Sequence, residues 1–218
     1  MNLVVVSSTQ LGSVFIKENL AKQEVLEYPG LTVTRGKLQG HKIILIEPGE
    51  GLEEVRITPE ILLNDLAAQN VVSLGKARCH LNSLAPGDIV VSAEADQKLV
   101  DLALRAVEKF GPDEKSCKVV VGRVVEAPAA QAVKPSGRKV KEIHCVDPEG
   151  YTQARDWSAE KIPFVLIRTI TPSDEESSDL TRFNWDMAKR NFWLVKGMLD
   201  SVKKLPAGKR SGSKTAQS

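Results

Sequence analysis

The stretch HCVDPEGYTQARDWSAEKIPFVLIRTI, residues 144–170, predicts a strand, a helix and a second strand in immediate succession. The first strand ends at Val146, and residues 150–160 suit a helix. Pro163–Ile170 then forms a continuous apolar run that is typical of a strand buried on both faces. Strands that alternate with helices in this way favour an α/β domain.

The same alternation extends over the rest of the chain. The strand that ends at Val146 begins at Glu142. The other expected strands are Leu3–Val6, Leu31–Arg35, Lys42–Ile46, Val71–Leu74, Ile89–Ser92 and Lys118–Val125, and the other expected helices are 10–22, 58–69, 97–110 and 181–203. In the last helix, apolar residues spaced by four and three positions form one stripe. The pattern as a whole predicts a three-layer α/β/α sandwich with a mixed, mostly parallel central sheet.

Length and charge predict one domain with a basic tail. The 218 residues, of which 42% are apolar and 27% charged, fit a single globular domain. Residues 203–218 hold five basic residues and no acid, so the net charge of +2 divides into −3 for residues 1–202 and +5 for the tail. We therefore expect a domain over 1–202 and a basic, disordered tail over 203–218. The mildly acidic domain argues against nucleic acid as a partner.

Cysteine usage and the N-terminus indicate a cytoplasmic protein. Cys79, Cys117 and Cys145 are odd in number and irregular in spacing, which is not a disulfide framework. The opening MNLVVVSS lacks the basic segment and the long apolar run of a signal peptide. Since no stretch approaches the roughly 20 apolar residues of a membrane helix, we expect no membrane partner.

Candidate site residues are those that directly follow a strand, because ligands in such sheets bind outside the carboxyl ends of the strands. Asp147 and Glu149 follow the strand that ends at Val146. They either accept N–H bonds at a helix N-terminus or bind sugar hydroxyls, since one carboxylate can accept two charge-assisted hydrogen bonds from a vicinal diol. The acidic stretch 171–176 is either a solvated loop or the source of a general acid.

A second group of candidates, Gly75, Lys76 and Arg78, follows the strand Val71–Leu74. These residues form either a surface loop or a tight turn whose basic side chains hold a phosphate or carboxylate.

Spacing excludes several other kinds of site. Gly49-Glu50-Gly51 is not a dinucleotide-binding fingerprint, because position 54 is Glu. His144 and Cys145 are adjacent on a strand and face opposite ways, so they do not share a metal ion. There is also no G-x-S-x-G elbow of a serine hydrolase. We expect no metal and no cofactor, with phosphate as a conceivable co-substrate.

Four segments together resemble the nucleoside phosphorylase superfamily, nearest to its methylthioadenosine/S-adenosylhomocysteine nucleosidase and futalosine hydrolase branch. They are GKLQGHKIILIEPGEG (36–51), VVSLGKARCHLNSLAPGDIVVSAEA (71–95), CKVVVGRVVEA (117–127) and the stretch 144–170. The most specific piece is LAPGDIVV (84–91), and the second is the acidic turn that precedes the strand ending Arg168-x-Ile170. The likeness runs in order through residues 1–202.

The resemblance implies a homo-oligomeric α/β sandwich that cleaves the N-glycosidic bond of a nucleoside, with water or phosphate as the acceptor. It implies that Glu149 grips the ribose hydroxyls and that Pro148 packs on the sugar. Asp147 and Arg168 are retained beside them. An acid after the Arg-x-Ile strand would protonate the leaving purine.

The chain departs from the family pattern at several positions. The expected acid falls at Pro172, so Asp174 is the candidate catalytic residue. The expected water-activating glutamate falls at about Gly12, and Arg78 stands where the family keeps bare backbone beside the sugar. The family segment that covers the nucleoside is reduced to Ala93–Asp96.

Three functions stay open from the sequence. The chain is a nucleosidase or phosphorylase for a purine-type nucleoside, or a catalytically inactive nucleoside-binding or scaffold homologue. The third is a different transferase or hydrolase that uses Lys76 and Arg78 to hold an anionic group.

Overall fold

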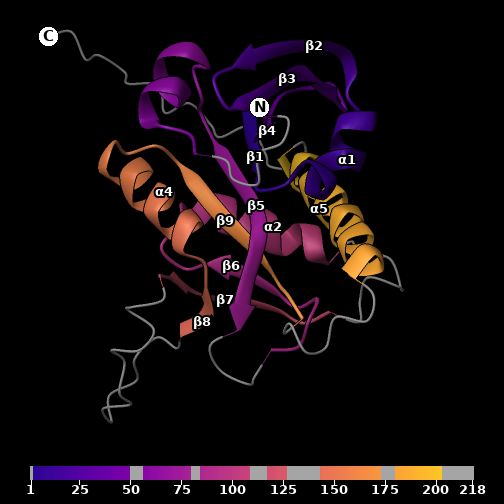
Figure 1. Ribbon diagram of the computed structural model, residues 1–218, viewed down its shortest axis with the longest axis vertical. Helices are drawn as coiled ribbons and strands as arrows, with labels where there is room; N and C mark the ends of the chain where they lie inside the picture. The colour runs from indigo at the N-terminus through magenta and orange to yellow at the C-terminus, as the bar shows by residue number, and fades with distance from the viewer. Residues whose placement is uncertain are drawn as a thin grey trace, which may run out of the picture.

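Figure 1 shows the computed structural model of the protein, which describes residues 2–49, 56–79, 84–108, 117–126, 143–172 and 180–202. The predicted tail, residues 203–218, and the predicted catalytic acid, Asp174, lie outside these described residues. None of the described helices is both long and apolar enough to cross a membrane.

The first part of the sheet is built from the N-terminal third of the chain. Its strands, in spatial order, are β2 (Ala21–Tyr28), β3 (Leu31–Leu38), β4 (His41–Pro48), β1 (Asn2–Ser7) and β5 (Val71–Cys79). β1 runs parallel to β4 and to β5, whereas β2, β3 and β4 form an antiparallel meander. The carboxyl ends of β1, β4 and β5 therefore meet at one edge of the sheet.

The second part of the sheet closes on itself through β5. Its strands are β9 (Phe164–Ile170), β6 (Ile89–Ser92), β7 (Val119–Val125) and β8 (Ile143–Val146). β5 pairs in parallel with β9 along Val71–Ala77 and then pairs antiparallel with β8 at Arg78 and Cys79. β9 continues to β6, β6 to β7 and β7 back to β8, so the five strands form a ring of pairings.

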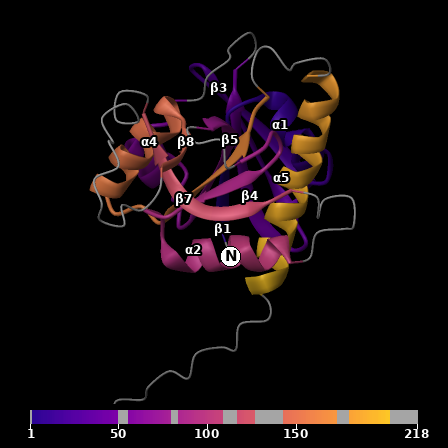
Figure 2. The same cartoon turned by 90° about the horizontal axis from the view of Figure 1, so that it is seen from below.

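Helices cover both faces of the sheet. α1 (Gln10–Glu18), α2 (Gln97–Val107) and α5 (Leu180–Val202) pack on one face, around a core that includes Leu3, Val5, Leu45 and Leu199. α4 (Pro148–Ala159) and the short π-helical turn Ile61–Asp65 cover the other face, against residues such as Val4, Ile46 and Trp157. Figure 2 shows α4 on the opposite side of the strands from α1 and α5. The predicted three-layer α/β/α fold with a mixed sheet is confirmed.

The stretch 144–170 folds as β8, α4 and β9, because its local signals agree with its burial. The Asp147 side chain caps α4 by accepting a hydrogen bond from the Gly150 amide at 3.1 Å, and Pro148 occupies the first turn, where its missing N–H costs nothing. The helix ends before Lys161, whose positive φ of 57° turns the chain toward β9. All residues of β9 are buried, as its uninterrupted apolar pattern predicts.

Three local predictions were wrong. β5 does not end at Leu74 but continues to Cys79, because β9 and β8 supply hydrogen-bonding partners for residues that look like a loop in isolation. The helix expected over 10–22 ends at Glu18, since Ala21 begins the unpredicted edge strand β2. The helix expected over 58–69 is only a short turn, of which Ile61–Asp65 is π-helical.

Candidate functional site

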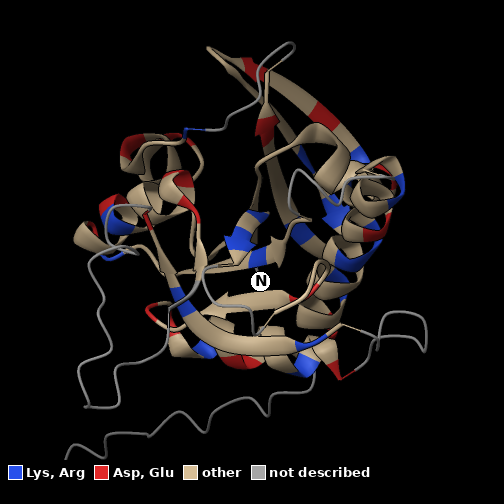
Figure 3. Ribbon diagram, turned by 60° about the horizontal axis from the view of Figure 1, so that its bottom comes forward, with Lys and Arg blue, Asp and Glu red and all other residues tan. Residues whose placement is uncertain are grey.

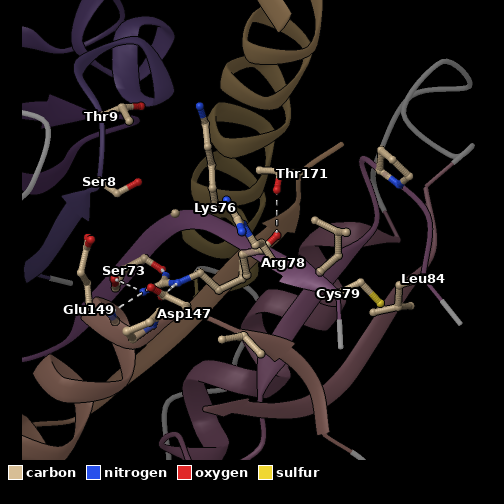
Figure 4. A pocket seen from close by; sticks show the side chains of 18 of the residues that line it. Ser8, Thr9, Ser73, Lys76, Arg78, Cys79, Leu84, Asp147, Glu149 and Thr171 are labelled. Atoms are coloured by element: carbon tan, nitrogen blue, oxygen red, sulfur yellow. Dashed lines mark hydrogen bonds and ion pairs between the residues drawn. The ribbon is translucent and has the colours of Figure 1, made fainter. Parts of the chain in front are cut away.

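An open cavity of about 1050 Å³ lies where β1, β5 and β9 end and where α1 and α4 begin. Since these three strands are parallel, their carboxyl ends present side chains and helix N-termini to the same space. Figure 4 shows the side chains that surround this space. All seven predicted substrate-binding residues line it: Gly75, Lys76, Arg78, Asp147, Pro148, Glu149 and Arg168.

A buried ion pair between Arg168 and Asp147 forms the floor of the cavity. Arg168 is 3% exposed, and its Nε donates to Asp147 Oδ2. Its Nη1 donates to the Ser73 carbonyl at 2.7 Å and its Nη2 to Ser73 Oγ at 3.1 Å (Figure 4). The other Asp147 oxygen, Oδ1, caps α4. Both oxygens of Asp147 are therefore engaged by the protein, so this carboxylate positions its neighbours.

Two glycines make room for the Arg168 guanidinium. A Cβ at Gly75 would lie 3.3 Å from Arg168 Cζ and 3.3 Å from Ser8 Oγ. A Cβ at Gly150 would overlap both Arg168 Nη2 and Asp147 Oδ2. Glycine at these positions lets the ion pair sit directly against β5 and the first turn of α4.

Glu149 is placed at the cavity rim by this arrangement. It lies in the first turn of α4, two residues after Asp147, and its side chain is exposed. In Figure 4 the Glu149 carboxylate points into the cavity on the side of Ser8. A carboxylate so placed can accept hydrogen bonds from a ligand that enters the cavity.

Lys76 and Arg78 reach the cavity from the unexpected extension of β5. Side chains two residues apart on a strand share a face, so both point to the same side. Arg78 is exposed, whereas Lys76 is half-buried, and this burial lowers the pKa of the Lys76 ammonium from its ordinary value. The same cavity is therefore lined by two basic side chains and by Glu149.

On the α1 side, none of the described residues that line the cavity is a carboxylate, whereas the resemblance implies one there. Thr9 Oγ1 accepts from the Gly12 amide at 3.0 Å and so caps α1. Gly12 is buried, and a Cβ there would lie 2.9 Å from Thr9 Oγ1 and 3.2 Å from Ser7 Oγ. Glu47, the buried carboxylate nearest to α1 in the fold, does not line the cavity. Its oxygens accept from Ser13 Oγ at 2.6 Å and Lys17 Nζ at 2.9 Å.

At the end of β9, Pro172 lines the cavity and offers no proton. Asp174 stays a prediction, because it lies outside the described residues. Within the described part of the chain, no group of three or more His, Cys, Asp or Glu side chains could hold a metal ion.

Sequence reasoning missed Ser73, which fixes two nitrogens of Arg168. The available signal was a serine within the apolar run Val71–Leu74, since a polar side chain in a buried strand needs a partner. Ser8 and Thr9 also line the cavity, and nothing in the sequence beyond their place after β1 marks them.

Comparison with known proteins gives a consistent set of relatives. The model of the phosphorylase superfamily matches residues 2–129. A 5′-methylthioadenosine/S-adenosylhomocysteine nucleosidase of Bacillus thuringiensis subsp. konkukian is 24% identical over 211 residues, which cover 83% of this chain and 90% of that protein.

Two solved structures share the fold. The nucleosidase of the same name from Colwellia psychrerythraea, in complex with adenine, superposes with a TM-score of 0.71 at 22% identity, over 92% of this chain and 95% of its own. A futalosine hydrolase mutant from Helicobacter pylori gives a TM-score of 0.68 at 13% identity, over 92% and 99% of the two chains.

Proposed function

The chain belongs to the phosphorylase superfamily, and from this membership we propose that it cleaves the N-glycosidic bond of a purine-type nucleoside. The nucleosidase similar to it along most of its length, and the adenine bound in the Colwellia structure, support a purine leaving group. Water or phosphate serves as the acceptor, and no cofactor takes part.

The observation that carries this proposal is the position of Glu149 above the buried Asp147–Arg168 pair. The pair fixes the start of α4, so Glu149 is held at the rim rather than on a mobile loop. We propose that its carboxylate accepts hydrogen bonds from the two vicinal hydroxyls of the ribose. These bonds strengthen as positive charge develops on the sugar ring, which lowers the barrier to bond cleavage.

The departing purine must accept a proton, because an anionic base is a poor leaving group. Pro172 follows β9 at the cavity and has no proton to give. We therefore keep Asp174, two residues further along the chain, as the proposed general acid.

A second candidate function is a nucleoside-binding protein without catalytic activity. The observation that favours it is the packing around Gly12, where the resemblance implies a water-activating glutamate. The neighbouring Thr9 and Ser7 hydroxyls leave no room for a larger side chain without a shift. In this function, Glu149 would bind the sugar and no bond would be cleaved.

The test is release of free base from a panel of purine nucleosides, with and without phosphate. We expect release from at least one nucleoside, and Glu149→Gln should lower kcat/KM for it about a hundredfold or more. The matched control is Glu160→Gln, an exposed carboxylate at the other end of α4, which should leave the rate unchanged.

Two other outcomes count against the proposal, the first against catalysis and the second against the role of Glu149. If the folded protein binds nucleosides in calorimetry but releases no base, the second candidate function replaces the first. If Glu149→Gln and Glu160→Gln have equal rates, Glu149 has no part in the reaction.

A further inference from the structure

Two of the three cysteines lie directly opposite each other in the sheet. Cys79, the last residue of β5, pairs in register with Cys145 of the antiparallel strand β8. Side chains directly opposite each other on antiparallel strands lie on the same face of the sheet. Cys145 is fully buried in the core beneath α4, and Cys79 packs against this core. Cys117 packs against the core on the other face, so it takes no part in this pair.

The spacing of antiparallel strands suits a disulfide at this position. Residues directly opposite each other have Cα atoms about 4.5 or 5.5 Å apart, depending on whether they exchange backbone hydrogen bonds. Disulfides usually join Cα atoms that are roughly 4.4–6.8 Å apart. Cys79 and Cys145 are both thiols in this structure. An S–S bond between them therefore needs rotation of the side chains and little movement of the strands.

The two thiols differ in their access to solvent. Cys79 is half-buried and lines the open cavity, beside Leu84 in Figure 4, so a small oxidant can reach its sulfur. Burial raises the pKa of the Cys145 thiol to about 12, and the nearby Cys79 contributes to this rise. Cys145 therefore stays protonated at neutral pH. An accessible thiol with a second thiol directly opposite it is the arrangement of an attacking and a resolving cysteine.

We propose that hydrogen peroxide oxidises Cys79 and Cys145 to a disulfide that joins β5 to β8 at the edge of the cavity. The Cys79 thiolate attacks one peroxide oxygen, the O–O bond breaks, and the leaving hydroxide takes up the Cys79 proton, which gives a sulfenic acid and water. The Cys145 sulfur then attacks the Cys79 sulfur, the S–O bond breaks, and the leaving hydroxide takes up the Cys145 proton. Two thiols and one peroxide thus become one disulfide and two water molecules.

The disulfide fixes one wall of the cavity. Within the described part of the chain, β5 and β8 pair at only two positions, one of which is Cys79 with Cys145. Asp147, which caps α4, lies two residues after Cys145, so the bond ties the end of β5 to the start of that helix. Lys and Arg occur on the central strands as well as on the helices (Figure 3), and those on β5 are Lys76 and Arg78. Because thiols and disulfides are both uncharged, oxidation holds these basic side chains in place without adding charge to the cavity.

The experiment treats the reduced full-length protein with hydrogen peroxide, alkylates the remaining thiols under denaturing conditions and maps the cysteines by peptide mass spectrometry. We expect one product, in which Cys79 and Cys145 are linked within one chain and Cys117 is alkylated. Its melting temperature should exceed that of the reduced protein by about 4–16 °C, the range for a typical disulfide in a domain of this size. Dithiothreitol should abolish this rise.

Variants assign the effect to the two cysteines. In Cys79→Ser and in Cys145→Ala, peroxide should neither form the linked peptide nor raise the melting temperature. Each variant is compared with its own reduced form, so any loss of stability from the substitution itself cancels. Cys117→Ser is the matched control, because it removes the cysteine on the other face of the sheet. This control should keep both the linked peptide and the rise in melting temperature.

The inference is overturned if Cys79 and Cys145 are both alkylated after peroxide treatment, or if Cys79 becomes a sulfinic acid without a link. It is also overturned if the linkage involves Cys117, or if a non-reducing gel shows that it joins two chains. A linked peptide with an unchanged melting temperature would contradict the claim that the bond holds β5 to β8. None of these measurements uses a nucleoside, so their outcome does not depend on the proposed function.

Discussion

The α4 side and the α1 side of the cavity differ in the polar side chains that they hold in place. On the α4 side, Arg168, Asp147 and Ser73 form a buried network that sets Glu149 at the rim. On the α1 side, Thr9 caps a helix whose first turn carries a packed glycine, and no carboxylate from α1 lines the cavity. Under the proposed function, the α4 side would position the sugar, and the proton would be supplied by a part of the chain other than α1.

The largest effect on stability is expected when the buried ion pair on the α4 side is broken. Arg168→Met would leave Asp147 as an uncompensated buried carboxylate, so we expect the free energy of unfolding to fall by about 3–5 kcal/mol. Urea denaturation followed by circular dichroism measures this change. The control is Arg155→Met, since Arg155 is exposed, its ion-pair partner Asp156 is partly exposed, and such a surface contact contributes little. A loss no greater than that of the control would show that the buried pair does not hold the site together.

A smaller effect is expected when a carboxylate is placed on the α1 side. Gly12→Glu forces a Cβ against Thr9 Oγ1, and we expect about 1–3 kcal/mol of destabilisation from overpacking. Gly12→Ala should share most of this loss, because the clash is at Cβ. Neither variant should release base faster than the wild-type protein. A Gly12→Glu protein that is both stable and faster would mean that the α1 side is ready to accept the missing group.

The smallest expected effect tests the cap of α1 alone. Thr9→Ala removes the oxygen that accepts from the Gly12 amide, and we expect the free energy of unfolding to fall by about 1 kcal/mol. Thermal denaturation measures this change. Ser158→Ala, at an exposed position near the end of α4, should leave the free energy of unfolding unchanged in the same measurement. If the two alanine variants melt at the same temperature, the Thr9 cap does not stabilise α1.

The sequence predicts much of the α4 side, because its signals are local. Asp147 directly follows β8, Pro148 and Gly150 lie in the first turn of α4, and an uninterrupted apolar run forms β9. The role of Asp147 is not local, since the choice between a cap and a ligand depends on Arg168, 21 residues away. The local sequence does not predict the extension of β5 either, because β8 and β9, which are distant in sequence, provide its hydrogen-bonding partners. Sequence alone therefore placed Lys76 at the site but in a loop rather than a strand.

The central claim is that Glu149 binds the ribose hydroxyls. Its most direct test compares nucleosides that differ in one of these hydroxyls. Base release is measured by chromatography from a ribonucleoside and from its 2′-deoxy counterpart, in wild-type protein and in Glu149→Gln. For each nucleoside, the rate in wild-type protein is divided by the rate in Glu149→Gln. This ratio cancels the difference in intrinsic reactivity between the two nucleosides. We predict that Glu149→Gln slows the ribonucleoside about tenfold more than the 2′-deoxynucleoside, which offers one hydroxyl fewer to the carboxylate. Equal slowing of both nucleosides would contradict the claim.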